Sequence, residues 1–118
     1  MLRLLCALLF SSYDTFCPVS DVIPRSAIPD PQSVELWLKV NGTLKQHGNT
    51  SDQIFDLRTL IAHISTIFTL EEGDLILTGT PEGVGPVKPG DVMTAGIKGL
   101  EKYDIEFGVT NKYPAAKL

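Results

Sequence analysis

The chain has 118 residues, of which 43% are hydrophobic and 20% are charged, and these values are typical of a single globular domain. Its formal net charge is −4, and its lysines and arginines are scattered, so it offers no basic surface for nucleic acid. The two cysteines, Cys6 and Cys17, lack the spacing of a zinc site and are too few for a disulfide framework, which indicates a reducing compartment.

Residues 1–12, MLRLLCALLFSS, differ from the rest of the chain, since they hold one arginine, an apolar run and two serines. The run is too short to span a bilayer, and a single arginine is a weak start for a secretory signal. No membrane segment is expected, and secretion is less favoured than an intracellular location. Three interpretations remain open: a signal or transit remnant, a buried strand or helix, or an abnormal chain start.

The next segment predicts an extended approach to a β-hairpin. Four prolines within residues 17–31 exclude a central strand or helix there. Residues 34–40 alternate apolar and polar side chains and then meet Asn41-Gly42, a pair that adopts positive φ at both turn positions at little cost. His47 follows in a short polar strand, where we expect it to face solvent or to be satisfied by a hydrogen bond.

A helical period begins after Asp56. Apolar side chains recur at positions 57, 60, 61, 64, 67 and 68, which predicts an amphipathic helix over residues 57–68 with Asp56 as its N-cap. His63 lies at the edge of the apolar stripe, where a structural histidine is more common than a catalytic one.

The remaining elements are short strands. GDLILTG, from Gly73, and GDVMTAG, from Gly90, form a quasi-repeat in which a turn leads into an apolar strand. Alternation over residues 103–109 predicts a last half-buried strand, and residues 114–118 form a frayed tail. One helix among about five strands predicts a predominantly β fold.

The loop at residues 77–91 holds four glycines and three prolines. It is not a P-loop, because Val84 stands where the second glycine is required, and it is not a dinucleotide fingerprint, because Lys88 stands where the last glycine is required. Pro81 and Pro86 also lack the N–H groups that a phosphate nest would use. Two interpretations remain open: a binding loop for a ligand other than a nucleotide phosphate, or a tight connection between strands.

The sequence shows no recognisable catalytic machinery. The acidic residues are singletons or turn residues, and the chain contains neither Glu-x-Glu nor His-x-x-x-His. No serine lies in a Gly-x-Ser-x-Gly elbow, and Cys17 has no histidine nearby in sequence to activate it.

Four separated stretches nevertheless resemble a known family. YDTFCPVSDVIP, LWLKVNGTLKQHGNTSDQIF, EEGDLILTGTPEGVGPVKPGD and AGIKGLEKYDIEF are similar, in this order, to the carboxyl-terminal half of the fumarylacetoacetate hydrolase family. The similarity is greatest to its mitochondrial acylpyruvase and oxaloacetate decarboxylase branch. It implies a mixed β-roll, a homodimer, a mitochondrial or cytosolic location, and Mg²⁺- or Mn²⁺-dependent hydrolysis, decarboxylation or tautomerisation of small 2-oxo (β-dicarbonyl) acids.

The resemblance also assigns residues. It implies that the Thr80 hydroxyl and backbone donors near Gly79 hold a substrate carboxylate or carbonyl oxygen, and that Thr15 lies next to the pocket. In the family the metal polarises the substrate carbonyl and is held by a Glu-x-Glu pair and a later aspartate, none of which this chain contains. Ser11 stands where the family has a pocket lysine.

The resemblance therefore predicts residues 13–113 as the carboxyl-terminal part of a catalytic domain, incomplete by itself. Because residues 1–12 resemble nothing in the family, an abnormal start or truncation is the preferred interpretation of that run. Without metal ligands or lysine, we expect the chain alone to bind no metal, to have no catalytic residue of its own and to be inactive. The alternative is a non-catalytic β-roll module for binding or dimerisation.

Overall fold

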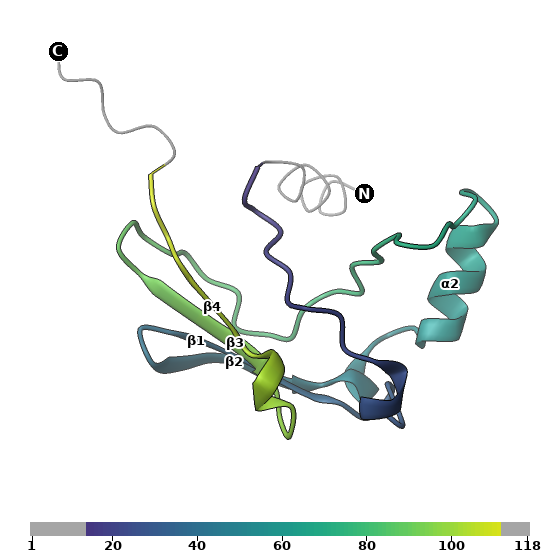
Figure 1. The fold of residues 1–118 in the computed structure, drawn as a ribbon, viewed down its shortest axis with the longest axis horizontal. Coiled ribbons are helices and arrows are strands. Elements are labelled where there is room, and N and C mark those ends of the chain that lie inside the picture. The colour runs from purple at the N-terminus through teal and green to yellow at the C-terminus, as the bar shows by residue number, and fades with distance from the viewer. Residues whose placement is uncertain (1–13, 112–118) are drawn as a thin grey trace, which may run out of the picture.

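A computed structural model describes residues 14–111. The predicted apolar start, Ser11 and the predicted tail lie outside this part. The described chain forms strands β1 (Glu35–Val40) and β2 (Thr43–Asn49), helix α2 (Leu57–Ser65), and strands β3 (Val92–Ile97) and β4 (Ile105–Gly108). The strands make one antiparallel sheet in the order β2-β1-β3-β4 (Figure 1). The predicted fold class, mostly sheet with a single helix, is confirmed for these residues.

The predicted hairpin is present, and its turn does more than reverse the chain. Asn41 and Gly42 have φ angles of 50° and 76°, as the Asn-Gly pair predicts. The Asn41 side chain also donates to Asp91 Oδ1 at 2.8 Å and accepts from the backbone N–H of Val92 at 2.9 Å. The turn between β1 and β2 therefore fixes the place where β3 begins.

The pairing of β1 with β2 contains one irregularity. Leu38 pairs with Gln46 and Lys39 pairs with Leu44, so Lys45 is an extra residue in β2. Such a β-bulge reverses which side chains of the strand share a face with which partners. Gln46 consequently lies opposite Leu38, whereas an unbroken register would place it opposite Trp37.

Helix α2 begins as predicted and ends earlier than predicted. The Asp56 carboxylate accepts from the backbone N–H of Thr59 at 2.6 Å, and this hydrogen bond, followed by that of the Thr59 side chain, lowers the pKa of Asp56. The helix stops at Ser65, and Thr66 is its C-cap. It stands away from the sheet (Figure 1), and Ile61 is exposed, because its apolar face has little to pack against.

The quasi-repeat gives the same turn twice but a strand only once. In both turns the aspartate side chain accepts from the backbone N–H three residues earlier: Asp74 from Glu71 at 2.8 Å, and Asp91 from Lys88 at 2.7 Å. The second turn enters β3, while residues 75–80 form no strand. The predicted strand after Gly73 is therefore wrong. Residues 75–80 pair with no strand of the described sheet, so their backbone groups lack the hydrogen-bond partners that a strand requires.

The segments before β1 and β4 contain short 3₁₀ turns. The proline-rich approach has no strand or α-helix, as predicted, and one such turn at Arg25–Ala27. Another turn, Glu101–Tyr103, takes up the start of the predicted last strand, which is observed only as β4. A third, Thr50–Asp52, follows β2.

No helix within residues 14–111 has the length and apolar character needed to cross a membrane.

No side chain among the described residues is fully buried. The residues of β1 are half-buried, and large apolar side chains elsewhere remain exposed. They are Phe16, Val19, Val22, Leu44, Ile54, Phe55, Ile61, Ile67, Phe68, Leu75, Leu77, Val84, Val87 and Val92. A single sheet layer with one distant helix leaves such side chains without the second layer that normally covers them.

Candidate functional site

The glycine-rich loop crosses one face of the sheet and separates two open cavities. One cavity, of about 270 Å³, lies over the centre of the sheet, where Leu38 and Ala95 are among its lining residues. The other, of about 620 Å³, lies toward the end of β2 and is lined by both polar and apolar side chains. Gly79, Thr80 and Pro81 line both cavities, so the exposed Thr80 hydroxyl lies at their boundary.

Two glycines allow the loop to approach β2 closely. A Cβ atom at Gly48 would lie 2.9 Å from Cβ of Pro81, and a Cβ atom at Gly83 would overlap the carbonyl oxygen of Lys45. Gly83 also has a φ of 97°, a conformation that L side chains rarely adopt. Neither position tolerates a side chain without moving the loop.

Gln46 holds the same loop by hydrogen bonds. Its Nε2 atom donates to Thr80 Oγ1 at 2.8 Å and to the carbonyl oxygen of Pro81 at 2.7 Å. The loop is thus packed onto β2, and the chain before it forms no strand, so it is not a tight connection between two strands. Sequence reasoning missed Gln46, since a polar residue in a polar strand carries no pattern that separates it from its neighbours.

The other sequence-predicted residues have different surroundings. Gly79 has a φ of 112°, and no atom lies within 4 Å of a Cβ built on it, so its backbone conformation is the reason for glycine there. Thr15 is exposed, with a φ of 72°, and is not among the described residues that line the two cavities at Thr80. Its place beside the pocket stays a prediction. Cys17 is a free, exposed thiol.

The described residues do not fit a metal centre. Nowhere in residues 14–111 do three or more His, Cys, Asp or Glu side chains come together in a group that could hold a metal ion. We therefore assign no metal ligand and no metal-dependent step to this part of the chain.

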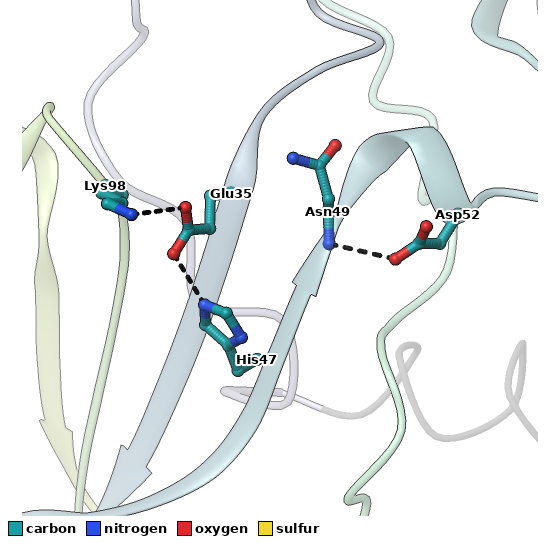
Figure 2. Close-up of polar contacts among 5 residues, drawn as sticks. All are labelled: Glu35, His47, Asn49, Asp52 and Lys98. Atoms are coloured by element: carbon teal, nitrogen blue, oxygen red, sulfur yellow. Dashed lines mark hydrogen bonds and ion pairs between the residues drawn. The ribbon is translucent and has the colours of Figure 1, made fainter.

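A separate polar cluster joins β1, β2 and Lys98, the residue that follows β3 (Figure 2). Glu35 Oε1 lies 2.7 Å from His47 Nε2, and Glu35 Oε2 accepts from Lys98 Nζ at 2.7 Å. The hydrogen bond from Lys98, and after it that from His47, lowers the pKa of the Glu35 carboxyl. His47 is therefore satisfied by a hydrogen bond, as predicted. His47 and Lys98 are exposed and Glu35 is half-buried, so the cluster is a surface link between β1, β2 and the end of β3.

The end of β2 is fixed by local hydrogen bonds. Asn49 Oδ1 accepts from the backbone N–H of Ser51 at 2.9 Å, and the Asn49 backbone N–H donates to Asp52 Oδ2 at 3.4 Å, the contact drawn in Figure 2. Thr50 Oγ1 donates to the Pro31 carbonyl and accepts from the backbone N–H of Val34. These contacts tie the proline-rich approach to the strand pair on which the loop rests.

Comparison with known proteins identifies the family to which this sheet and its glycine-rich loop belong. The model of the fumarylacetoacetate (FAA) hydrolase carboxyl-terminal domain matches residues 4–107, so the match begins inside residues 1–12, where none of the four family-like stretches lies. The chain belongs to this family.

Similar proteins match this chain over less than half of their own length. A mitochondrial oxaloacetate tautomerase of Oryza sativa subsp. japonica is 57% identical over 104 residues, which are 88% of this chain and 44% of that protein. A mitochondrial oxaloacetate decarboxylase of Dictyostelium discoideum is 59% identical over 97 residues, 82% of this chain and 44% of that protein.

Solved structures share the fold. The crystal structure of maleylpyruvate hydrolase from Sphingobium sp. SYK-6, in complex with manganese(II) ion and pyruvate, matches with a TM-score of 0.72 and 42% identity. The match covers 83% of this chain and 36% of that one. The chain thus spans under half the length of these relatives.

Proposed function

We propose that the chain supplies the substrate-binding loop of a mitochondrial enzyme that acts on small 2-oxo acids by tautomerisation, decarboxylation or hydrolysis. Two of its relatives are named as mitochondrial enzymes of oxaloacetate, and a third is a hydrolase in complex with pyruvate. The observation that carries the proposal is the exposed Thr80 hydroxyl, held between two cavities by a loop that is fixed to the sheet.

In this proposal Thr80 donates its hydroxyl proton to a carboxylate or carbonyl oxygen of the substrate, and Gly79 permits the backbone to approach the same oxygen. A divalent ion, Mg²⁺ or Mn²⁺, would polarise the 2-oxo group when it is bound in a complete enzyme. Residues 14–111 offer no ligand set for that ion, so their part is to bind and orient the substrate. The active assembly is a homodimer in the same proposal.

The first test uses the 118-residue chain alone. We expect no oxaloacetate decarboxylation or tautomerisation above the rate of Mg²⁺ or Mn²⁺ in buffer, because the described residues provide no template for the ion. Turnover that exceeds the metal-only rate and is lost in Thr80→Val would contradict the idea that catalysis needs further residues.

The second test supplies the rest of an enzyme. In a chimera, this chain replaces the matched part of the Dictyostelium oxaloacetate decarboxylase. Thr80→Val removes one hydrogen bond to an anionic oxygen, which costs about 1.5–3 kcal/mol, or a loss of roughly tenfold to hundredfold in kcat/KM. Thr80→Ser keeps the hydroxyl and should stay near the parent.

Thr94→Val is the matched control for Thr80→Val, since it makes the same change on β3 at a residue that lines neither cavity at Thr80. Equal kinetics for Thr80→Val and Thr94→Val in an active chimera would show that Thr80 does not contact substrate.

A further inference from the structure

We infer that Gln46 is a positioning residue: it fixes the direction in which the Thr80 hydroxyl donates and so prepares that hydroxyl for an anionic substrate oxygen. The inference rests on the proposed function. It concerns a residue on β2 that would not itself contact the substrate.

The Pro81 carbonyl fixes the orientation of the Gln46 amide. A backbone carbonyl oxygen can only accept a hydrogen bond, and the Pro81 carbonyl lies 2.7 Å from the Gln46 side chain. The NH₂ group, and not the amide oxygen, must therefore face the loop.

The Gln46 amide in turn sets the direction of the Thr80 proton. The Gln46 NH₂ group has two hydrogens, and it has two acceptors in reach, the Pro81 carbonyl and Thr80 Oγ1 at 2.8 Å. Thr80 Oγ1 thus accepts from Gln46, and its own hydrogen must be directed away from that nitrogen. A hydroxyl in this state presents a donor, which is the group that a carboxylate or a developing enolate oxygen requires.

The β-bulge at Lys45 brings Gln46 to the face of the sheet that carries the loop. The extra residue Lys45 shifts the register of β2, so Gln46 shares a sheet face with Leu38 and lines the cavity beside Thr80. Without the bulge, side-chain alternation would place Gln46 opposite Trp37 on the other face. The same bulge brings the Lys45 carbonyl against Gly83, so one irregularity supports both contacts.

The first experiment tests the hydrogen bonds in the 118-residue chain by NMR. We expect both side-chain amide protons of Gln46 to exchange with water more slowly than in the urea-unfolded chain, and Thr80→Val to release one of the two. Exchange as fast as in the unfolded chain would overturn the inference, whatever the chain's activity.

The second experiment uses the chimera described above, with oxaloacetate as substrate. Gln46→Glu should be the more harmful change, because an ionised carboxylate accepts from Thr80 and turns its proton inward. We expect a rise in KM at least as large as that of Thr80→Val, roughly tenfold to hundredfold. Gln46→Leu leaves the hydroxyl free to rotate and should raise KM only about twofold to tenfold.

This order separates a hydrogen-bonding role of Gln46, toward Thr80 and the Pro81 carbonyl, from packing. Glutamate matches glutamine in shape better than leucine does, so a residue that only fills space would tolerate Gln46→Glu better than Gln46→Leu. Gln32→Glu is the matched control, because its Oε1 atom accepts from the Leu57 backbone N–H and the change keeps an acceptor there.

The chimera can disprove the role of Gln46 without disproving the proposed function. A chimera weakened by Thr80→Val but unaffected by Gln46→Glu would overturn the inference and leave the proposed function standing. A chimera unaffected by Thr80→Val would overturn both. A milder effect for Gln46→Glu than for Gln46→Leu would assign Gln46 to packing alone.

Discussion

The turns at residues 71–74 and 88–91 are built in the same way, yet the chain that comes after them differs. Each has a glycine with positive φ, 99° at Gly73 and 95° at Gly90, followed by an aspartate that accepts from the backbone three residues earlier. After the second turn the chain enters β3, whereas after the first it runs across the sheet face without strand pairing. Local sequence determines the turn, and a neighbouring strand determines whether the next residues form a strand.

In the second unit the strand has a neighbouring strand on each side. Val92 donates from its backbone to Asn41 Oδ1 and pairs with Gly108, so β3 has strands on both sides. Leu75, at the same position of the first unit, is 72% exposed. An apolar strand sequence without backbone partners leaves its N–H and C=O groups to solvent.

The last glycine of each unit shows the same contrast. A Cβ at Gly96, on β3, would overlap Asp104 Oδ1 and lie 2.7 Å from the Trp37 ring, so packing requires glycine there. Gly79 has open space around it, and only its φ of 112° requires glycine. Glycine is thus required at Gly96 by close packing and at Gly79 by backbone conformation.

The largest expected effect on the free energy of unfolding is that of Gly96→Ala, and Gly79→Ala is the substitution to compare with it. Gly96→Ala overpacks the centre of the sheet and should lower the free energy of unfolding by about 1–3 kcal/mol. Gly79→Ala strains a segment outside the sheet, so we expect the loop to shift locally and the free energy of unfolding to change less. Urea denaturation of the full chain measures both. An equal loss for the two variants would show that residues 75–79 are as firmly integrated as β3.

An intermediate effect on stability is expected from substituting Asp91, the aspartate of the second turn. The backbone N–H of Lys88, and next the Asn41 side chain, lower the pKa of Asp91 below its ordinary value of 3.8. Because the folded pKa is the lower one, the stabilisation is complete above the unfolded pKa and is lost as the pH falls through the folded pKa. Asp91→Asn should therefore reduce stability at neutral pH and remove part of the loss seen as the pH falls below the ordinary value of 3.8.

Asp74→Asn is the matched control for Asp91→Asn, since the Asp74 carboxylate also accepts from a backbone N–H but its turn lies outside the sheet. Thermal unfolding of both variants between pH 7 and pH 3 makes the comparison. Identical pH profiles for Asp91→Asn and the unmodified chain would show that the Asp91 contacts do not contribute to folding.

Much of this fold could be predicted from local signals. The Asn41-Gly42 turn, the Asp56 N-cap and the final alternating strand each depend on residues close in sequence, and each is observed. The prediction of a strand after Gly73 is wrong, because strand pairing depends on a segment that is distant in sequence. The predicted helix end at residue 68 is also wrong. The helix ends at Ser65, because the apolar side chains after it have nothing to pack against.

The candidate site could be predicted only in part. The glycine loop and Thr80 were found through the family resemblance, because loop composition alone left two interpretations open. Gln46 depends on a bulge at Lys45, and no residue pattern in β2 announces where its register shifts. The same holds for the second role of Asn41, whose side-chain partners lie fifty residues or more away in sequence.

The smallest expected effect on stability, and the clearest one on association, comes from the third position of each unit. Leu75, the third residue of the first unit, is 72% exposed, and Leu77, two residues later, is 65% exposed. Both lie in a segment without strand pairing, a combination that favours association of chains. The charge of −4 opposes this only weakly at physiological salt, where repulsion is screened beyond about 8 Å. We therefore expect the unmodified chain to self-associate in light scattering.

Leu75→Ser should reduce that association and leave the unfolding curve unchanged, because the side chain contributes to no packed layer. Val92→Ser makes a similar change inside β3 and should lower the free energy of unfolding by up to about 1 kcal/mol, the span of strand preferences, without improving solubility. If the unmodified chain is a monomer that unfolds cooperatively, or if Leu75→Ser destabilises it as much as Val92→Ser does, then the first unit is held by contacts as extensive as those of the second. In that case an absent strand neighbour no longer explains why only one unit forms a strand.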